Sequence, residues 1–448
     1  MIERWSRDQV LALAPDPPSQ KAAQGVAAPG KWSARGVAGT VVFGACRGSG
    51  KNPYQACVDL SEPAYRCGCP SRKFPCKHAL GLLLLWSSGE VPEAAEPPDW
   101  VREWMDGRTE RAAKSAAKVE AARAAAESPA APGTTTGPGS GPGSGPGSST
   151  ASHAASGPAA VRLARVEAGL AELERWLGDQ VRQGLTGAGE SDWEGLAKRL
   201  VDAQAPGAAG TVARLGRLRG DDGWPGLILG EYALLHLLAV AYRRREELSA
   251  PLAATVLSRA GFPMTKEEVL AGPVLRDRWD ILGRRDEEQD RLSARRVWLR
   301  GRDSGRDALV LSFAAPGQAL DASLVTGAAI DAELAFYPGA APLRAVVAAR
   351  HETLPARVPG GQAPYDALGR VAAAVEADPW TDAWPVVLAG VVPGEREAGG
   401  LPWHPAAREP WRLIAVSGGR PVTLAAEWTP RGLRPLTTWD DEGQVVIL

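Results

Sequence analysis

Between Tyr65 and Trp86 the chain reads Tyr65-Arg-Cys67-Gly-Cys69-Pro-Ser-Arg-Lys-Phe-Pro-Cys76-Lys-His78-Ala-Leu-Gly-Leu-Leu-Leu-Leu-Trp86. Three cysteines and one histidine occur here as two close pairs, and sulfur with imidazole nitrogen is a usual donor set of tetrahedral structural zinc. We therefore predict a Cys₃His zinc site with the ligands Cys67, Cys69, Cys76 and His78. Ordinary buried thiols or a redox pair are the alternatives, but a disulfide between Cys67 and Cys69 would need unusual backbone geometry.

The residues around the ligands indicate how the chain brings them together. Gly68 tolerates positive φ and Pro70 presets its own φ, so both favour a turn at the first pair. The second pair precedes Ala79–Trp86, which has the composition of a helix. Cys76 is therefore expected at a helix N-terminus, where the positive end of the dipole favours a thiolate. The ligand set contains no carboxylate, so we predict a structural rather than a hydrolytic site.

Two apolar runs precede the cluster, Val41–Phe43 and Cys57–Leu60, with the turn-rich Gly44–Pro53 between them. They predict a β-hairpin on which the leucines of the helix pack, giving a ββα-type zinc module. Structural zinc in finger peptides contributes roughly 10–16 kcal/mol, so metal binding and folding are expected to be one event. Cys46 and Cys57 are interpreted as small apolar strand residues, with exchange into the zinc site as the alternative.

The spacing Cys-x-Cys, six residues, Cys-x-His, followed by an apolar helix, resembles the SWIM zinc finger. The resemblance covers about a sixth of the chain and rests on the four ligands, Pro70-Ser71 and Leu80–Leu85. It implies zinc as the cofactor and a macromolecular partner, DNA or protein, since SWIM modules occur in bacterial proteins, chromatin-remodelling helicases and Mutator-type transposases. The remaining chain is similar to larger bacterial SWIM proteins, which implies AAA+ ATPase or von Willebrand A-type partners.

Composition divides the chain into four parts and predicts an α+β multidomain protein. Residues 1–105 hold the zinc module. Residues 106–160 hold an Ala-rich helix, Arg111–Glu127, and a disordered Gly/Pro/Ser linker, Ser128–Pro158. Residues 161–290 are predicted to form a helical domain and residues 291–448 a β-rich domain, either a sandwich or a barrel.

Periodicity supports the last two assignments. Helices are expected at three places in the helical domain: the stripe from Leu163 to Leu177, Trp193–Gln204 and Leu227–Leu248. One more helix is expected at Ala367–Glu376. Strands are expected at Ala308–Phe313, Ala332–Tyr337, Pro385–Val392, Trp411–Val416, Val422–Trp428 and Val445–Leu448.

Candidate catalytic motifs are weak throughout. The segment Gly44–Asn52 is similar to a P-loop, but Ala45 and Asn52 occupy positions that require Gly and Ser or Thr. His236 is interpreted as a core or interface histidine, whereas His153, His351 and His404 lack partner motifs. The mixed charges of Arg276–Arg306 predict a solvated, salt-bridged helix face. We therefore expect no enzymatic activity; a pocket with convergent polar groups in the C-terminal half would support an enzyme.

Charge and hydropathy set the remaining expectations. The formal net charge is −1, so a nucleic-acid surface must be local. Between residues 31 and 78 two acidic residues face eight basic ones: Lys31, Arg35, Arg47, Lys51, Arg66, Arg72, Lys73 and Lys77. Arg66, Arg72, Lys73 and Lys77 flank the ligands and are the candidate contacts to phosphates or an acidic protein; balancing the negative zinc site is their structural alternative.

The apolar runs Ala79–Trp86 and Tyr232–Tyr242 are shorter than the ~20 residues of a membrane span, and residues 1–8 contain no signal-peptide core. A soluble, cytoplasmic protein is expected. The leading hypothesis is a non-enzymatic adaptor, with a zinc finger on a flexible tether beside a body that holds protein partners. The alternatives are DNA binding by the basic finger and an unrecognised enzyme in the C-terminal half.

Overall fold

The N-terminal part of the computed structural model is an antiparallel meander covered by helices. The structure describes residues 4–48, 52–127, 157–289, 292–315, 318, 320–407 and 410–448. The sheet has the order β1 (Trp32–Ala38), β2 (Val41–Cys46), β3 (Tyr54–Asp59) and β4 (Ala64–Cys67). The predicted hairpin is β2 and β3, which pair in antiparallel register from Val41 with Asp59 to Cys46 with Tyr54.

Three helices cover this sheet and its edge: α1 (Arg7–Ala12), α2 (Pro17–Gln24) and α3 (Lys77–Ser87). The leucines of α3 are buried and contact β2 and β3, as predicted. A side chain at Gly81 would meet Val26 at 2.6 Å, so this glycine permits the close approach of the segment after α2. The predicted Ala-rich helix is α4, which runs from Asp99 to Glu127 and packs Val101 against the sheet.

The helical part begins at α5 (Pro158–Gln183) and continues through α6 (Glu190–Asp202), α7 (Pro206–Leu218) and α8 (Trp224–Arg243). These four helices share one apolar core, in which the Trp193 indole donates to the Tyr232 hydroxyl at 3.0 Å. Two further helices, α9 (Ala250–Ala260) and α10 (Lys266–Ala271), complete the predicted helical region. The Gly/Pro/Ser linker predicted before it lies almost wholly outside the described residues.

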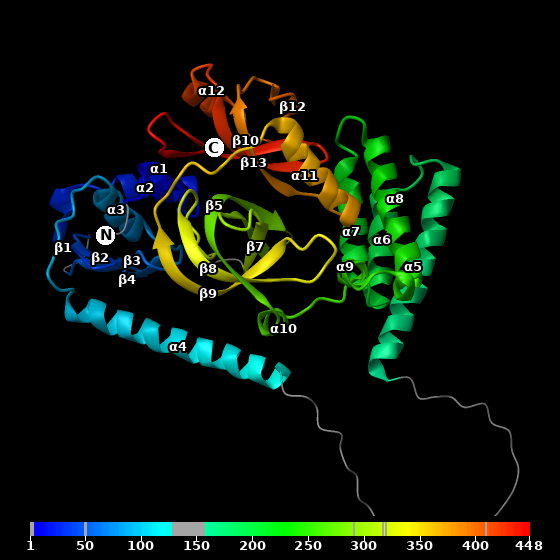
Figure 1. Ribbon diagram of the computed structural model, residues 1–448, viewed down its shortest axis with the longest axis horizontal. Helices are drawn as coiled ribbons and strands as arrows, with labels where there is room; N and C mark the ends of the chain where they lie inside the picture. The colour runs from blue at the N-terminus through cyan, green and yellow to red at the C-terminus, as the bar shows by residue number, and fades with distance from the viewer. Residues whose placement is uncertain are drawn as a thin grey trace, which may run out of the picture.

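A closed five-stranded barrel follows, in the order β5-β6-β7-β9-β8. Figure 1 shows it between the N-terminal part and the helices. Its strands are β5 (Val274–Gln289), β6 (Leu292–Gly301), β7 (Asp307–Ala314), β8 (Ala329–Phe336) and β9 (Arg344–Leu354). A four-stranded sheet packs on the barrel in the order β10 (Trp384–Val391), β13 (Val422–Thr429), β14 (Gly432–Trp439) and β15 (Val445–Ile447).

The C-terminal sheet and the barrel approach closely. Leu282 and Trp298 of the barrel share an apolar cluster with Val387 and Leu436 of the sheet. A side chain at Gly283 would lie 2.5 Å from the Leu436 Cβ, so the backbone of β5 can pass here only without one. The sheet is accompanied by α11 (Pro364–Ala377), α12 (Trp411–Ser417) and the short pair β11 (Glu397–Ala398) and β12 (Leu401–Pro402).

The N-terminal part is not suspended from a tether; it packs directly on the barrel. A single apolar cluster runs from Trp5, Val10 and Leu83 into Trp279 and Leu299 of the barrel. The Gln9 amide also donates to the Thr326 carbonyl across this joint at 2.9 Å. The prediction of a finger that moves freely beside the body is therefore wrong, because apolar residues of both parts are buried against each other.

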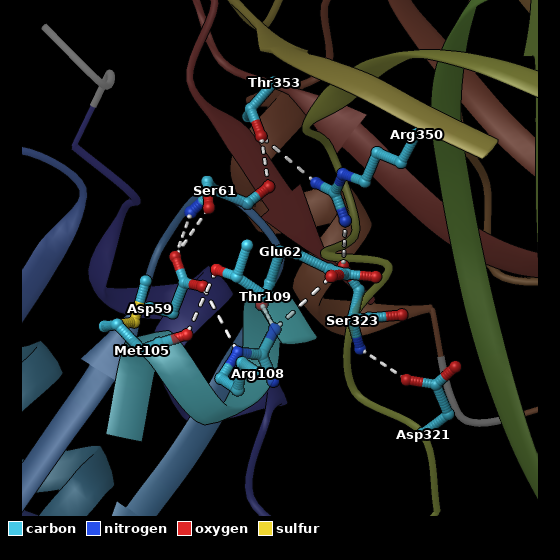
Figure 2. A network of polar contacts seen from close by, with 10 residues as sticks. All are labelled: Asp59, Ser61, Glu62, Met105, Arg108, Thr109, Asp321, Ser323, Arg350 and Thr353. Carbon is cyan, nitrogen blue, oxygen red and sulfur yellow. Dashed lines mark hydrogen bonds and ion pairs between the residues drawn. The ribbon is translucent and has the colours of Figure 1, made fainter. Parts of the chain in front are cut away.

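A polar network borders the same joint (Figure 2). The buried Asp59, at the end of β3, accepts from Ser61 and lies 3.5 Å from the Arg108 Nε of α4. The Ser61 carbonyl accepts from the Thr353 hydroxyl at 2.9 Å, and the Arg350 guanidinium donates to that hydroxyl at 3.1 Å. Three elements, β3, α4 and β9, are thus held together by one chain of contacts.

Two sequence predictions fail in the C-terminal half. Arg276–Arg306 is not a helix face but lies mostly in the hairpin of β5 and β6, so the helical part ends at Ala271 rather than near residue 290. Its charges pair across the strands, as Arg295 does with Asp286 at 2.7 Å. Trp411–Val416, predicted as a strand, belongs to the helix α12, where Leu413 and Ser417 are buried at a spacing of four.

The longest apolar helix also differs from its prediction. Within the described ranges α8 is the one helix that could cross a membrane by length and composition, since it has 20 residues. It also supplies Tyr232, Leu235 and Leu238 to the core of the helical bundle.

Candidate metal centre

The four predicted ligands converge on one point. Their donor atoms all lie within 4.8 Å of one another, and the Cys67 Sγ is 3.7 Å from the His78 Nδ1. Cys67 ends β4, Cys69 follows in the loop, Cys76 is the N-cap of α3 and His78 lies in its first turn. Three sulfurs and one imidazole nitrogen at this separation match the donor set of a structural zinc site. Zinc is the cofactor that this cluster fits.

The local sequence explains part of this convergence. Pro75 is buried immediately before the helix, and the Cys76 backbone is extended, as an N-cap requires. Gly68 does not adopt positive φ, and a side chain there would meet nothing within 4 Å. Gly68 is therefore not in the left-handed conformation that glycine tolerates, and the turn between the two cysteines forms without it.

The contact between Cys67 and Cys76 changes the pKa values of both thiols. The Cys67 thiol donates to the Cys76 sulfur and, with the His78 side chain and the Ala79 amide, lowers the Cys76 pKa to about 4. The same contact with Cys76, together with burial, raises the Cys67 pKa. One thiolate is thus already favoured at the helix N-terminus before a metal arrives, as expected from the dipole.

Two aromatic residues support the cluster and were not identified from the sequence. The Tyr54 ring lies 4.9 Å from the His78 ring, at an interplanar angle of 32°, and fixes the orientation of this ligand. Tyr65 lies two residues before Cys67 and buries its hydroxyl against the barrel, which raises its pKa. No local motif identifies either residue, because both act through contacts between separate segments.

The other two cysteines lie outside the cluster. Cys46 and Cys57 are buried thiols at the end of β2 and within β3, as interpreted from the sequence. Burial raises the Cys46 pKa and raises that of Cys57 to about 12. Burial therefore disfavours the thiolate form, which a metal ligand needs, at both positions.

Several of the basic residues around the site are bound to the chain itself. Lys73 pairs with Asp16, and the Arg66 guanidinium donates to the Trp100 carbonyl at 3.0 Å. Lys31 and Arg35 donate to backbone carbonyls in the same way. Arg72, Lys77 and Arg47 are exposed, whereas Lys51 lies outside the described residues. Donation to a neutral carbonyl leaves the charge of Arg66 in place, so the exposed basic face beside the ligands consists of Arg66, Arg72 and Lys77, with Lys73 paired to Asp16.

Two cavities lie away from the metal centre. The larger, about 720 Å³, is enclosed by the helical bundle, the barrel and the loop before β10. Its charged residues have both signs; Arg259 pairs with Asp378 at 3.4 Å, and burial raises the Glu231 pKa. The second, about 560 Å³, includes His351 and Glu352 beside the N-terminal segment. None of the four metal ligands lines either cavity.

The histidines outside the cluster have varied surroundings. His236 is exposed on α8, 3.6 Å from Glu174, so its interpretation as a core residue is wrong. His351 pairs with Glu333 at 3.0 Å. His404 is buried, with the Ala406 amide facing its Nδ1 and the Arg434 guanidinium facing its Nε2. Burial and the neighbouring arginines lower the His404 pKa to about 4.

The lowered pKa of His404 predicts that the folded chain loses stability at acid pH. Below pH 6.5 the unfolded chain protonates His404 while the folded chain does not, so stability is lost as the pH falls from 6.5 toward 4. We expect His404→Gln to remove about 2 kcal/mol of the loss between pH 7.5 and pH 5. Urea unfolding at pH 7.5, 6 and 5 measures it, with His351→Gln as the control. Parallel pH profiles for the wild type and His404→Gln would contradict the assignment.

Comparison with known families agrees with the geometry. The model of the SWIM zinc finger matches residues 57–86, which include the end of β3, all of β4 and all four metal ligands. The model of the SWIM-associated four-helix bundle domain matches residues 161–260, which run from α5 to the end of α9. No curated protein and no solved structure matches the chain.

Proposed function

We propose that this chain, in which residues 57–86 match the SWIM zinc finger and residues 161–260 match the SWIM-associated four-helix bundle domain, is a zinc-dependent, non-enzymatic adaptor for macromolecules, chiefly proteins. One observation carries the proposal. The metal cluster lies at the edge of the finger, with Cys67 and Cys69 half-buried, and the finger itself is packed on the barrel. A surface held in this way is preorganised for a partner, because little conformational freedom remains to be lost on binding.

Charge favours a protein partner over a nucleic acid. Lys73 already pairs with Asp16, and the formal net charge is −1. Affinity for a polyanion grows with the number of phosphates that a protein neutralises, and the exposed residues Arg66, Arg72 and Lys77 beside the ligands supply few contacts. A small acidic patch on a protein can be complemented by a few such cations. AAA+ ATPase and von Willebrand A-type proteins are the first partners to test.

The experiment is an affinity pull-down from the native host with surface variants that leave the ligands in place. We expect Arg72→Glu/Lys77→Glu to lose partners that the wild type retains, because it reverses the basic edge beside the zinc. The matched control is Arg182→Glu/Lys198→Glu, which reverses two exposed cations on the helical bundle. Identical partner sets for wild type and both variants would contradict a role for the finger.

Nucleic-acid binding is tested with the same proteins. We expect duplex DNA and single-stranded RNA to show no retention by the full chain at about 50 mM salt. Retention that falls steeply with salt and disappears in Arg72→Glu/Lys77→Glu would instead make nucleic acid the partner of the finger.

A further inference from the structure

The outer face of α8 is largely apolar and exposed, with the exposed His236 at its edge. Leu229 and Leu237 on it are 47% and 40% exposed and lie about two helical turns apart. Gly226, Gly230 and Ala233 are exposed beside them at spacings of three and four, so all five residues lie on one face. The opposite face is buried in the bundle. Adjacent exposed leucines on a soluble domain indicate an interaction surface.

This face is symmetric about its centre. Leu229 and Leu237 lie four residues before and after Ala233, and Gly226 and Val240 lie seven residues before and after it. If two such helices cross at Ala233 in antiparallel orientation, each Leu229 meets Leu237 of the partner subunit. Each Gly226 then meets Val240 of the partner subunit and each Gly230 meets His236 of the partner subunit, so a glycine leaves room for a larger side chain at these positions. Self-complementarity of this kind is the property of a twofold interface.

The charges at the two ends follow the same symmetry. Asp222 lies in the turn just before α8 and Arg244 is its C-cap, so one exposed acidic and one exposed basic residue mark the two ends of the helix. An antiparallel pair places Asp222 against Arg244 of the partner subunit at both ends, whereas a parallel pair would place like charges together. Arg244 contacts Glu247 within its own chain, but 61% of its side chain is exposed, so that contact is weak and exchangeable.

From these observations we propose that the chain forms a homodimer through the outer face of α8, with the helices antiparallel and a twofold axis at Ala233. The partner is a second copy of the chain, because the spacing of the leucines and the charges at the two ends of α8 fit an identical helix in antiparallel orientation. The helix of 20 residues is about 30 Å long, so the contact is small and the dimer depends on concentration. The proposal is independent of the finger and of its partners.

The first test is sedimentation velocity of the full chain from low to high micromolar concentration. The wild type is expected to shift from monomer to dimer, and Ala233→Arg to remain monomeric because it places two arginines at the axis. Val201→Arg is the matched control, since Val201 is 56% exposed on α6. Circular dichroism shows that each variant is folded. A wild type that is monomeric at every concentration, or a dimer that Ala233→Arg leaves intact, would overturn the proposal.

The second test reads the orientation directly. Asp222→Arg and Arg244→Asp should each weaken dimerisation about tenfold, because each places like charges at both ends. An equimolar mixture of the two variants should restore association, since Asp and Arg then face each other at both ends of the mixed dimer. A mixture no stronger than either variant alone excludes the antiparallel pair. Binding of a monomeric wild type to phosphatidylcholine–phosphatidylglycerol vesicles, lost in Ala233→Arg, would replace the proposal with a membrane contact.

Discussion

Removal of zinc is expected to unfold the N-terminal part of the chain and to destabilise the barrel with it. Cys76 has the greatest effect among the ligands, because it is buried, caps α3 and is the thiolate that its neighbours favour. Structural zinc contributes roughly 10–16 kcal/mol in finger peptides, more than the whole stability of a typical domain. Cys76→Ser should therefore abolish stoichiometric zinc and expose Trp32 and Trp86, which are buried in the cluster shared with the barrel.

Metal content and tryptophan fluorescence measure this outcome, before and after a strong chelator. The matched control is Cys46→Ala, which removes a buried thiol from the same sheet but not from the metal cluster. It should retain one zinc per chain and lose only packing energy, about 1–2 kcal/mol. If Cys46→Ala lost the metal and Cys76→Ser kept it, the ligand assignment would be wrong.

Glu427→Gln is expected to weaken the packing of the C-terminal sheet on the barrel and so to lower the free energy of unfolding. The Glu427 carboxylate is 1% exposed, accepts from the Trp298 indole at 2.9 Å and lies 3.2 Å from the Arg434 guanidinium. Arg285 and Arg296 of the hairpin lie 3.9 Å away. Glutamine keeps the size but has one accepting oxygen instead of two, so the substitution removes the charge that balances three arginines and one of the two hydrogen bonds from Trp298 and Arg434. Leaving buried charges uncompensated costs about 3–5 kcal/mol.

Urea unfolding followed by fluorescence measures this loss, because Trp298 lies at the joint. The exposed Glu395 is the control, and Glu395→Gln should change stability by less than about 0.5 kcal/mol. An unchanged midpoint for Glu427→Gln would show that solvent, rather than this carboxylate, balances the arginines.

The metal centre could be predicted from the sequence because its chemistry is local. Four soft donors within one short segment restrict the fold to a turn and a helix start, and both are present. The barrel could not be predicted from the sequence, because its fold depends on pairing between strands that are far apart along the chain. Arg295 is buried by pairing with Asp286 across a hairpin, whereas the sequence alone shows only a run of mixed charges. The short apolar run after Trp411 fits a strand or a helix equally, and tertiary contacts decide between them.

The contact between the finger and the barrel could not be predicted either, for the same reason. Gln9 and Thr326, or Ser61 and Thr353, are separated by about three hundred residues, so no window of sequence reveals their contact. Val10 of α1 is fully buried at this joint, although nothing in the sequence around it indicates the barrel as its partner.

This shared core also determines what happens if the chain is divided. The only covalent link between residues 4–127 and residues 157–448 is the segment between them, but the contacts across the joint do not depend on it. Two separately produced polypeptides covering these ranges would therefore reassemble on mixing, and protease nicking between them would leave a particle of unchanged size. The two parts are therefore expected to stay together through their contacts even when the segment between them is cut.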